Sequence, residues 1–179
     1  MQTADAQFHD DSLALAKRLF TARAVASAYC TLKKALVCSP GSTAGVSLLG
    51  NIRLATGGKN IALVAFRRAV LLDERSDPRV WMNYGNALLV ANDGPRAVNI
   101  FRTVLRLDPD HVMAKTQLAV WYLQADMGDL ARPYLTDLTA QPNMPPRAAL
   151  VLADALRVFG ARNNARLFYG RAICPIPTI

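Results

Sequence analysis

The side chains best suited to bind a metal ion or to act as nucleophiles are few and scattered. The two histidines, His9 and His111, are far apart, and neither belongs to an H-E-x-x-H pattern. The three cysteines, Cys30, Cys38 and Cys174, form no C-x-x-C pair. A zinc site needs histidine and cysteine ligands at short spacing, so the sequence predicts no metal site. An odd number of cysteines without a disulfide framework indicates reduced thiols and favours a cytoplasmic protein.

Two glycine-rich stretches resemble phosphate-binding loops only loosely. They are SPGSTAG at 39–45 and ATGGKN at 55–60. A Walker A loop requires G-x-x-x-x-G-K-[ST] after a strand. In the second stretch Lys59 is followed by Asn60, and Arg53 stands at the first glycine position. We therefore interpret both stretches as turns between helices.

The carboxylates also give no catalytic pattern. Asp126 and Asp129 flank a predicted turn, where acidic side chains suit the start of the following helix. No G-x-S-x-G motif is present, and no serine or cysteine is paired with a nearby base. The sequence therefore predicts a protein that is not an enzyme and needs no cofactor.

Composition and charge describe a soluble, basic, globular chain. Of its 179 residues, 52% are hydrophobic, and the formal net charge is +8. Such a charge suits an acidic partner, a nucleic acid or a membrane surface, but no run of like charges or nucleic-acid-binding motif supports the second. We expect no nucleic-acid partner. No apolar stretch is long enough to span a membrane, and the amino terminus lacks the order of a secretory signal.

The positions of small residues reveal an internal repeat. They recur at intervals of 34 or 35 residues, at Ala16, Gly50, Gly85, Ala119 and Ala153. A second small residue follows each by twelve positions, at Ala28, Ala62, Ala97, Ala131 and Ala165. A large apolar residue comes four positions later, at Leu32, Phe66, Phe101, Leu135 and Tyr169. Small residues allow two helices to approach closely, so each unit is predicted to be a helix, a turn and an antiparallel helix. One such pair cannot bury both its faces, and neighbouring pairs must stack.

This pattern resembles the tetratricopeptide repeat (TPR). The segment from Trp81 to Pro109 matches the family pattern at Trp81, Tyr84, Gly85, Leu88, Ala97, Phe101 and Pro109. The resemblance implies an all-α, right-handed superhelical solenoid of about five helix-turn-helix repeats. We place a short polar tail at 1–8 and a TPR domain at 9–179. Its repeats are 9–42, 43–76, 78–111, 112–145 and 146–179.

One position departs from the pattern. Arg53 replaces the apolar residue of the other repeats, so either its side chain extends outward or the second repeat is looser.

The resemblance also implies a concave groove lined by the first helix of each repeat. Its predicted peptide-binding residues are Phe20, Asn51, Leu54, Met82, Asn83, Asn86, Leu89, Val90, Met113, Gln117, Val120 and Leu123. Two interpretations of the apolar members stay open. They receive an apolar or amphipathic segment of a partner, or several of them pack against the neighbouring helix or a terminal extension.

Some family members clamp a peptide's terminal carboxylate with paired lysines and asparagines. Here Ser47, Thr116 and Val120 stand where cations would be needed, so we expect no such clamp. Asn83 and Gln117 occupy equivalent positions in successive repeats, where they could hydrogen-bond an extended peptide backbone as a short amide ladder. The second helices carry a basic stripe, Lys33–Lys34, Arg67–Arg68, Arg102 and Arg171, which we interpret as a solvated face.

The sequence therefore predicts a cytoplasmic, bacterial, adaptor-like or chaperone-like scaffold that binds a protein or peptide. Two alternatives remain: a substrate-recognition arm of a larger enzyme such as a glycosyltransferase, or a self-assembling structural scaffold. The last helix has no following repeat, so we expect Leu167, Phe168 and Ile173 to be uncovered. Such a patch predicts a homo-oligomer, or a chain excised from a longer protein.

Overall fold

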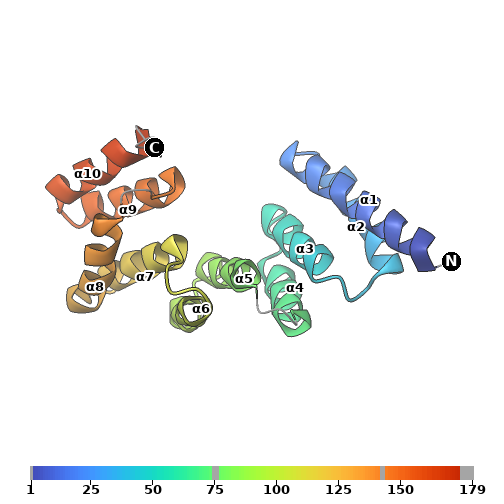
Figure 1. Ribbon diagram of the computed structural model, residues 1–179, viewed down its shortest axis with the longest axis horizontal. Helices are drawn as coiled ribbons and strands as arrows, with labels where there is room; N and C mark the ends of the chain where they lie inside the picture. Colours follow the sequence, from blue (N-terminus) through green and yellow to red (C-terminus); the bar gives the residue numbers. More distant parts are fainter. Residues whose placement is uncertain (1, 74–76, 142–143, 174–179) are drawn as a thin grey trace. The chain divides into compact units, whose positions relative to one another are not determined.

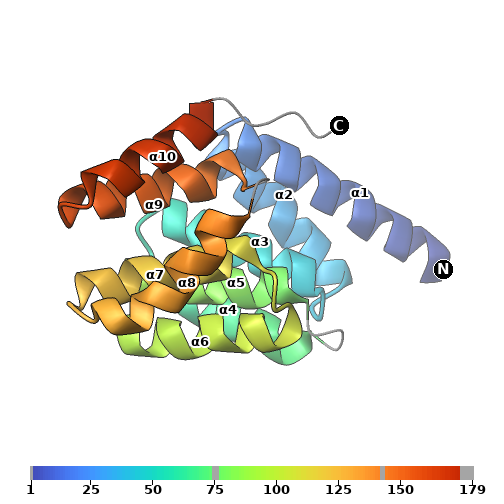
Figure 2. The ribbon, with the colours of Figure 1, turned by 60° about the vertical axis from the view of Figure 1, so that its left-hand side comes forward.

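The computed structural model describes residues 2–73, 77–141 and 144–173 as a succession of α-helices (Figures 1 and 2). Within these residues there are ten helices and no strand, which confirms the all-α helical repeat fold. The helices are α1 (Gln2–Thr21), α2 (Val25–Cys38), α3 (Thr43–Ala55), α4 (Lys59–Leu72), α5 (Pro78–Val90), α6 (Gly94–Leu107), α7 (Val112–Gln124), α8 (Gly128–Ala140), α9 (Pro146–Val158) and α10 (Arg162–Ile173).

The chain divides into two compact units, residues 1–100 and 101–179, and the boundary falls within α6. Residues 74–76, 142–143 and 174–179, at or near the ends of three predicted repeats, lie outside the described residues, and so does Cys174. No helix in the described part of the chain combines the length and the apolar character needed to cross a membrane.

The two helices of each pair are joined by the same three-residue turn. Its middle residue has a positive φ in all five pairs, at Arg23, Gly57, Asn92, Asp126 and Gly160. The N–H of the third turn residue donates to the carbonyl five residues earlier, as Gly58 does to Arg53 at 2.8 Å. This is the 6→1 hydrogen bond of a Schellman motif, which ends a helix and reverses the chain. The turn conformation therefore recurs in every repeat, as the helices do.

Small residues allow the paired helices to approach closely. A Cβ atom on Gly50 of α3 would lie 2.7 Å from the ring of Phe66 in α4, which is closer than real contacts allow. The equivalent second-helix positions, Ala28, Ala62, Ala97, Ala131 and Ala165, are all buried. The close approach that the repeat spacing predicts is thus present in the structure.

In unit 1, the core lies between consecutive helices from α1 to α5. One cluster joins Leu13 and Ala16 of α1 to Leu32 of α2 and Ile52 of α3. A second cluster joins α3 and α4 to Val80 of α5. Stacking of neighbouring pairs thus buries the faces that one pair leaves open.

In unit 2, the core is centred on α9. Alanines and leucines of this helix pack with Ala119 of α7, Leu138 of α8 and Phe168 of α10, and Figures 1 and 2 both show α9 and α10 side by side. Phe168 is fully buried, so the expectation that it is uncovered is wrong: it faces α9 rather than a following repeat. Leu167 and Ile173 are exposed.

The first helix is longer than the sequence suggests. The polar tail expected over residues 1–8 is helical from Gln2 onward in the structure. This stretch contains no glycine or proline to end a helix. Gln7 donates to Asp11 one turn later, at 3.3 Å, so this pair of polar side chains supports the helix.

Candidate functional site

The two histidines form hydrogen bonds at helix ends. His9 is buried, and its Nδ1 donates to the carbonyl oxygen of Ala35 at 2.9 Å. Its Nε2 lies 3.1 Å from Oγ of Ser42. His111 begins α7, where its Nδ1 accepts a hydrogen bond from the N–H of Ala114 at 3.2 Å. Both rings therefore have structural roles.

The two glycine-rich stretches are connections between helices. Residues 39–45 lead from α2 into α3, and residues 55–60 form the turn between α3 and α4. Cys30 and Cys38 are exposed and have no disulfide partner among the described residues.

The predicted groove residues lie on the first helices of the pairs, and we call the surface that they form the first-helix face. In unit 1 this face belongs to α1, α3 and α5, which contact one another in that order. Phe20 and Leu54 are half-buried and pack against core clusters of their own repeats and neighbours. Met82 is only 6% exposed. Leu89 is half-buried, and Val90 is 47% exposed. The accessible apolar surface of α5 is therefore centred on Leu89 and Val90.

The polar members of this face in unit 1 are unpaired amides. Asn51 of α3 and Asn83 and Asn86 of α5 are all half-buried. None of these amides has a hydrogen-bond partner within the described part of the chain. Each offers two N–H donors and a carbonyl acceptor, so the face carries open hydrogen-bonding groups beside apolar side chains.

Of the three positions where a carboxylate clamp needs cations, two hold hydroxyl groups and the third holds Val120. Ser47 is 8% exposed, and its Oγ has no hydrogen-bond partner in the described residues. Thr116 is fully buried, and its Oγ donates to the carbonyl oxygen of Val112 at 2.9 Å. This face offers no positive charge at either position.

In unit 2, the predicted groove residues of α7 are used largely in packing. Met113, Val120 and Leu123 are half-buried and pack against the cluster centred on α9. Gln117 is half-buried. Asn83 and Gln117 belong to different units.

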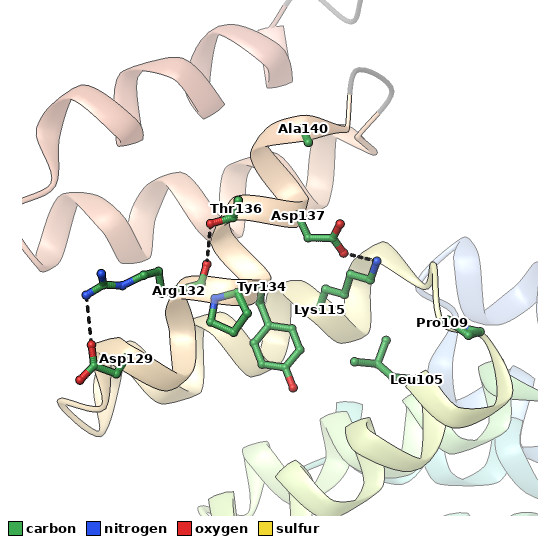
Figure 3. A pocket seen from close by; sticks show the side chains of 10 residues that line it. Leu105, Pro109, Lys115, Asp129, Arg132, Tyr134, Thr136, Asp137 and Ala140 are labelled. Carbon is green, nitrogen blue, oxygen red and sulfur yellow. Dashed lines mark hydrogen bonds and ion pairs between the residues drawn. The ribbon is translucent and has the colours of Figure 1, made fainter.

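A separate cavity of about 710 Å³ lies in unit 2 beside the second helices. It is lined by the end of α6, by Lys115 of α7 and by one side of α8 (Figure 3). The Lys115 ammonium pairs with Asp137 and lies 3.4 Å from Asp110. Figure 3 shows the lysine side chain reaching from α7 toward Asp137 across the cavity.

The electrostatics of this cavity favour a fixed ion pair. Lys115 is 6% exposed. The hydrogen bond to Asp137 raises the pKa of Lys115 above the usual lysine value, although burial acts in the opposite direction. For Tyr134 in the cavity wall, burial itself raises the pKa. Both groups therefore keep their protons at neutral pH, which suits a structural pair and not proton transfer.

Lys115 was not identified from the sequence, because the equivalent positions of the other repeats hold no charged residue. Ser12, Val46, Trp81 and Ala149 occupy the equivalent positions. The available signal was a pair of departures: a lysine where other repeats have uncharged residues, and Asp137 where two others have Arg68 and Arg171.

The arginine that replaces an apolar residue in the second repeat is held by a tyrosine. The Nη2 of Arg53 donates to the hydroxyl of Tyr29 at 2.6 Å, and its guanidinium carbon lies 4.5 Å from the ring centroid. Arg102 donates to Tyr122 in the same way, also at 2.6 Å. Each pair joins the second helix of one repeat to the first helix of the next.

The basic stripe is only partly a solvated face. Arg68 donates to the carbonyl oxygen of Pro40 at 3.0 Å. Arg171 donates to three carbonyl oxygens at the end of α8, those of Leu138, Thr139 and Gln141, at 2.8–3.2 Å. Arg171 thus binds the end of the preceding second helix, which corrects the expectation for this residue, whereas Arg68 binds the loop after α2 and remains exposed.

The chain resembles proteins of known structure over almost its whole length. The Pseudomonas aeruginosa protein pilF is 22% identical with a TM-score of 0.77, over 98% of this chain and 80% of pilF. PilW, a type IV pilus biogenesis factor, is 21% identical with a TM-score of 0.77, over 93% of this chain and 76% of PilW. YrrB, described as a TPR protein with an unusual peptide-binding site, is 17% identical with a TM-score of 0.64, over 90% of this chain and 83% of YrrB. At these identities the likeness shows the fold alone.

No curated protein sequence matches this chain. The family model for the tetratricopeptide repeat, however, matches residues 47–112 and 85–145. These overlapping matches cover more than half of the sequence, and they agree with the helix pairs and turns of the structure. The chain therefore belongs to the tetratricopeptide repeat family.

Proposed function

We propose that this chain is a non-catalytic scaffold that binds a peptide or helix of a partner protein on the first-helix face of unit 1. Repeat arrays of this kind present extended surfaces for protein binding. The observation that carries the proposal is the group of unpaired, half-buried amides of Asn51, Asn83 and Asn86 beside Leu89.

The spacing of these residues on α5 suits contact with one ligand. Asn83, Asn86 and Val90 follow one another at three and four residues, so they share one side of the helix. Asparagine amides can donate to the carbonyls and accept from the N–H groups of a peptide backbone. Leu89 and Val90 supply apolar contact at the same place. This combination binds a chain segment and has no group suited to turnover.

Most of the other predicted groove residues are used in packing within their own units. Phe20, Leu54 and Met82 are partly or fully used in the packing of unit 1. Met113, Val120 and Leu123 have the same role against α9 in unit 2. We infer that the two interpretations left open by the sequence divide between different residues of this set.

Selection of peptide ligands tests this proposal. Peptides from a displayed random library are selected on the immobilised full-length chain, and their affinities are measured by fluorescence polarisation. Peptides that bind the first-helix face should bind Leu89→Asp and the Asn83→Ala/Asn86→Ala variant about ten-fold more weakly or worse.

Leu167→Asp is the matched control, because Leu167 is an exposed leucine on the second helix α10. It should leave the affinities unchanged, and circular dichroism should show equal helicity in all variants. If every selected peptide binds Leu89→Asp as tightly as the original chain, the first-helix face is not the binding surface.

A further inference from the structure

The positive charge of this chain is concentrated in one segment. Residues 12–72 contain nine lysines and arginines and no aspartate or glutamate, whereas the whole chain has 21 basic and 13 acidic residues. This segment therefore carries a formal charge of +9, and the rest of the chain, with twelve basic and thirteen acidic residues, is close to neutral. The segment's cations are Lys17, Arg18, Arg23, Lys33, Lys34, Arg53, Lys59, Arg67 and Arg68.

This segment also contains an apolar groove, which we call the outer groove. It has a volume of about 210 Å³ and lies between α2 and α4, with α3 as its floor. Leu36, Val46 and Leu49 line it together with Ile61 and Val64 of α4. Among the described residues, Arg68 is the only charged side chain that contributes to the lining.

The rim of the outer groove combines exposed apolar side chains with cations. Val64 is 70% exposed and Leu71 is 77% exposed. With Arg67 and Arg68 they follow one another at intervals of three and four residues along α4, so they share one side of that helix. On α2, the exposed Lys33 and Val37 are likewise one turn apart.

The outer groove is the repeat equivalent of the cavity beside α8 in unit 2. Positions 69 residues apart, two repeat lengths, line both: Leu36 and Leu105, Pro40 and Pro109, Val46 and Lys115, Val64 and Pro133, Ala65 and Tyr134, Arg68 and Asp137. In unit 2 the floor position holds Lys115, which is paired with Asp137. In unit 1 the same positions hold Val46 and Arg68. The same hollow is therefore ionic in one repeat and apolar with a basic rim in another.

We propose that the outer groove of unit 1 binds an acidic amphipathic helix of a partner protein. The apolar face of such a helix would cover Leu49, Ile61 and Val64, and its carboxylates would meet Lys33, Arg67 and Arg68. Apolar burial provides the contact, and the absence of acidic residues from α2, α3 and α4 makes the charges complementary. This site is separate from the first-helix face of the proposed function.

The shape and composition of the surface favour a protein helix over a membrane. A membrane-binding face presents a convex apolar ridge and commonly carries tryptophan or tyrosine at the level of the headgroups. The outer groove is a hollow, and no aromatic residue lines it. A hollow between two helices instead suits the side chains on one face of a third helix.

The test uses the full chain and a synthetic probe, a fluorescent peptide of about sixteen residues with leucine on one helical face and glutamate on the other. We expect micromolar binding that weakens as salt rises from about 50 to about 300 mM. Val64→Asp should weaken binding about ten-fold or more, and Arg67→Glu should weaken it and reduce the salt dependence. A peptide with lysine in place of glutamate, and one with serine in place of leucine, should not bind.

Matched controls separate this site from other surfaces. Val158→Asp alters a valine of α9 that is 71% exposed, and Arg166→Glu alters an exposed arginine of α10. Both should bind the probe as the original chain does. Leu89→Asp should also bind it normally, so the outcome is independent of the first-helix face.

Three results would overturn the proposal. The first is the absence of probe binding. The second is binding that Val64→Asp leaves unchanged, which would show that the basic surface binds polyanions in general and that the apolar groove is not used. The third is preferential binding to vesicles containing about 25% phosphatidylglycerol, with loss on Val64→Asp, which would show a membrane-binding face.

Discussion

At the scale of single residues, the close packing of paired helices depends on sites where a large side chain fills the space beside a small one. Gly50 and Phe66 are the clearest pair, because the phenylalanine ring occupies the position of the missing Cβ. The glycine is needed here for close approach and not for an unusual backbone angle. Gly170 in α10 is the contrasting case, because a Cβ atom there would meet no described atom within 4 Å.

Alanine at these two glycines should have opposite effects. Gly50→Ala should lower the free energy of unfolding by about 1–3 kcal/mol, because Phe66 has to move out of a packed core. Gly170→Ala should raise it by up to about 1 kcal/mol, because alanine is the better helix former. Chemical denaturation followed by circular dichroism measures both. A neutral Gly50→Ala would show that α3 and α4 do not approach as closely as described.

The ion pair of Lys115 predicts an asymmetry between its partners. Asp137→Asn leaves a buried ammonium with only Asp110 nearby and should destabilise the chain by about 1–3 kcal/mol. Lys115→Met leaves Asp137, which is about half exposed, in contact with water and should cost less than about 1 kcal/mol. Because the fold raises the pKa of Lys115, this contribution is complete at neutral pH and is lost only as alkaline pH passes the raised value.

A double-mutant cycle at neutral pH checks this asymmetry. In the Lys115→Met background, Asp137→Asn should have almost no further effect. Equal losses for the two single variants would contradict the account of a buried cation held by accessible carboxylates.

At the scale of elements, the five turns are alike in backbone although they differ in sequence. Glycine occupies the left-handed position in two of them, and Arg23 occupies it in the first. An L-residue with a side chain is strained in this conformation. The first turn is therefore the least favourable of the five.

Substitutions in the turns should follow this difference. Arg23→Gly should stabilise the chain by about 0.5–1 kcal/mol, since relief of strain outweighs the greater freedom of glycine in the unfolded chain. Gly57→Ala should destabilise it by about 1 kcal/mol for the converse reason. Thermal or chemical unfolding of the two variants measures both. Destabilisation by Arg23→Gly would show that the arginine side chain contributes more than its backbone costs.

At the scale of the whole molecule, the structure consists of two compact units built from one repeated element. In such arrays each repeat is stabilised mainly by its neighbours. A destabilising substitution should therefore increase local unfolding in its own and adjacent helices more than in distant ones.

Hydrogen exchange of Gly50→Ala tests this locality. We expect faster amide exchange in α3 and α4, and a smaller increase in α2 and α5, which pack against them. Exchange in α9 and α10 of unit 2 should stay close to that of the original chain. Equal acceleration in every helix would show that the chain unfolds as one cooperative body.

The spacing of small and large residues was sufficient to predict the fold, because each pair such as Gly50 and Phe66 has its cause within one repeat. The site was less predictable, because exposure depends on the next repeat. Met82 and Leu89 looked equivalent in sequence, yet Met82 is buried and Leu89 is half-buried. Lys115 and the outer groove were missed because both depend on side chains that different helices bring together.

The arginine that links α10 to α8 has a consequence for the length of the earlier helix. The guanidinium of Arg171 donates to the carbonyl oxygens of Leu138, Thr139 and Gln141, and Arg68 donates to that of Pro40 from the same position in its own repeat. A planar group with donors in fixed directions can satisfy these oxygens only where the helix terminates. Arg171 thus sets the length of the preceding second helix. In a chimaera, a helix grafted in the place of α8 would have to end at the same position, because otherwise the guanidinium would lose its acceptors.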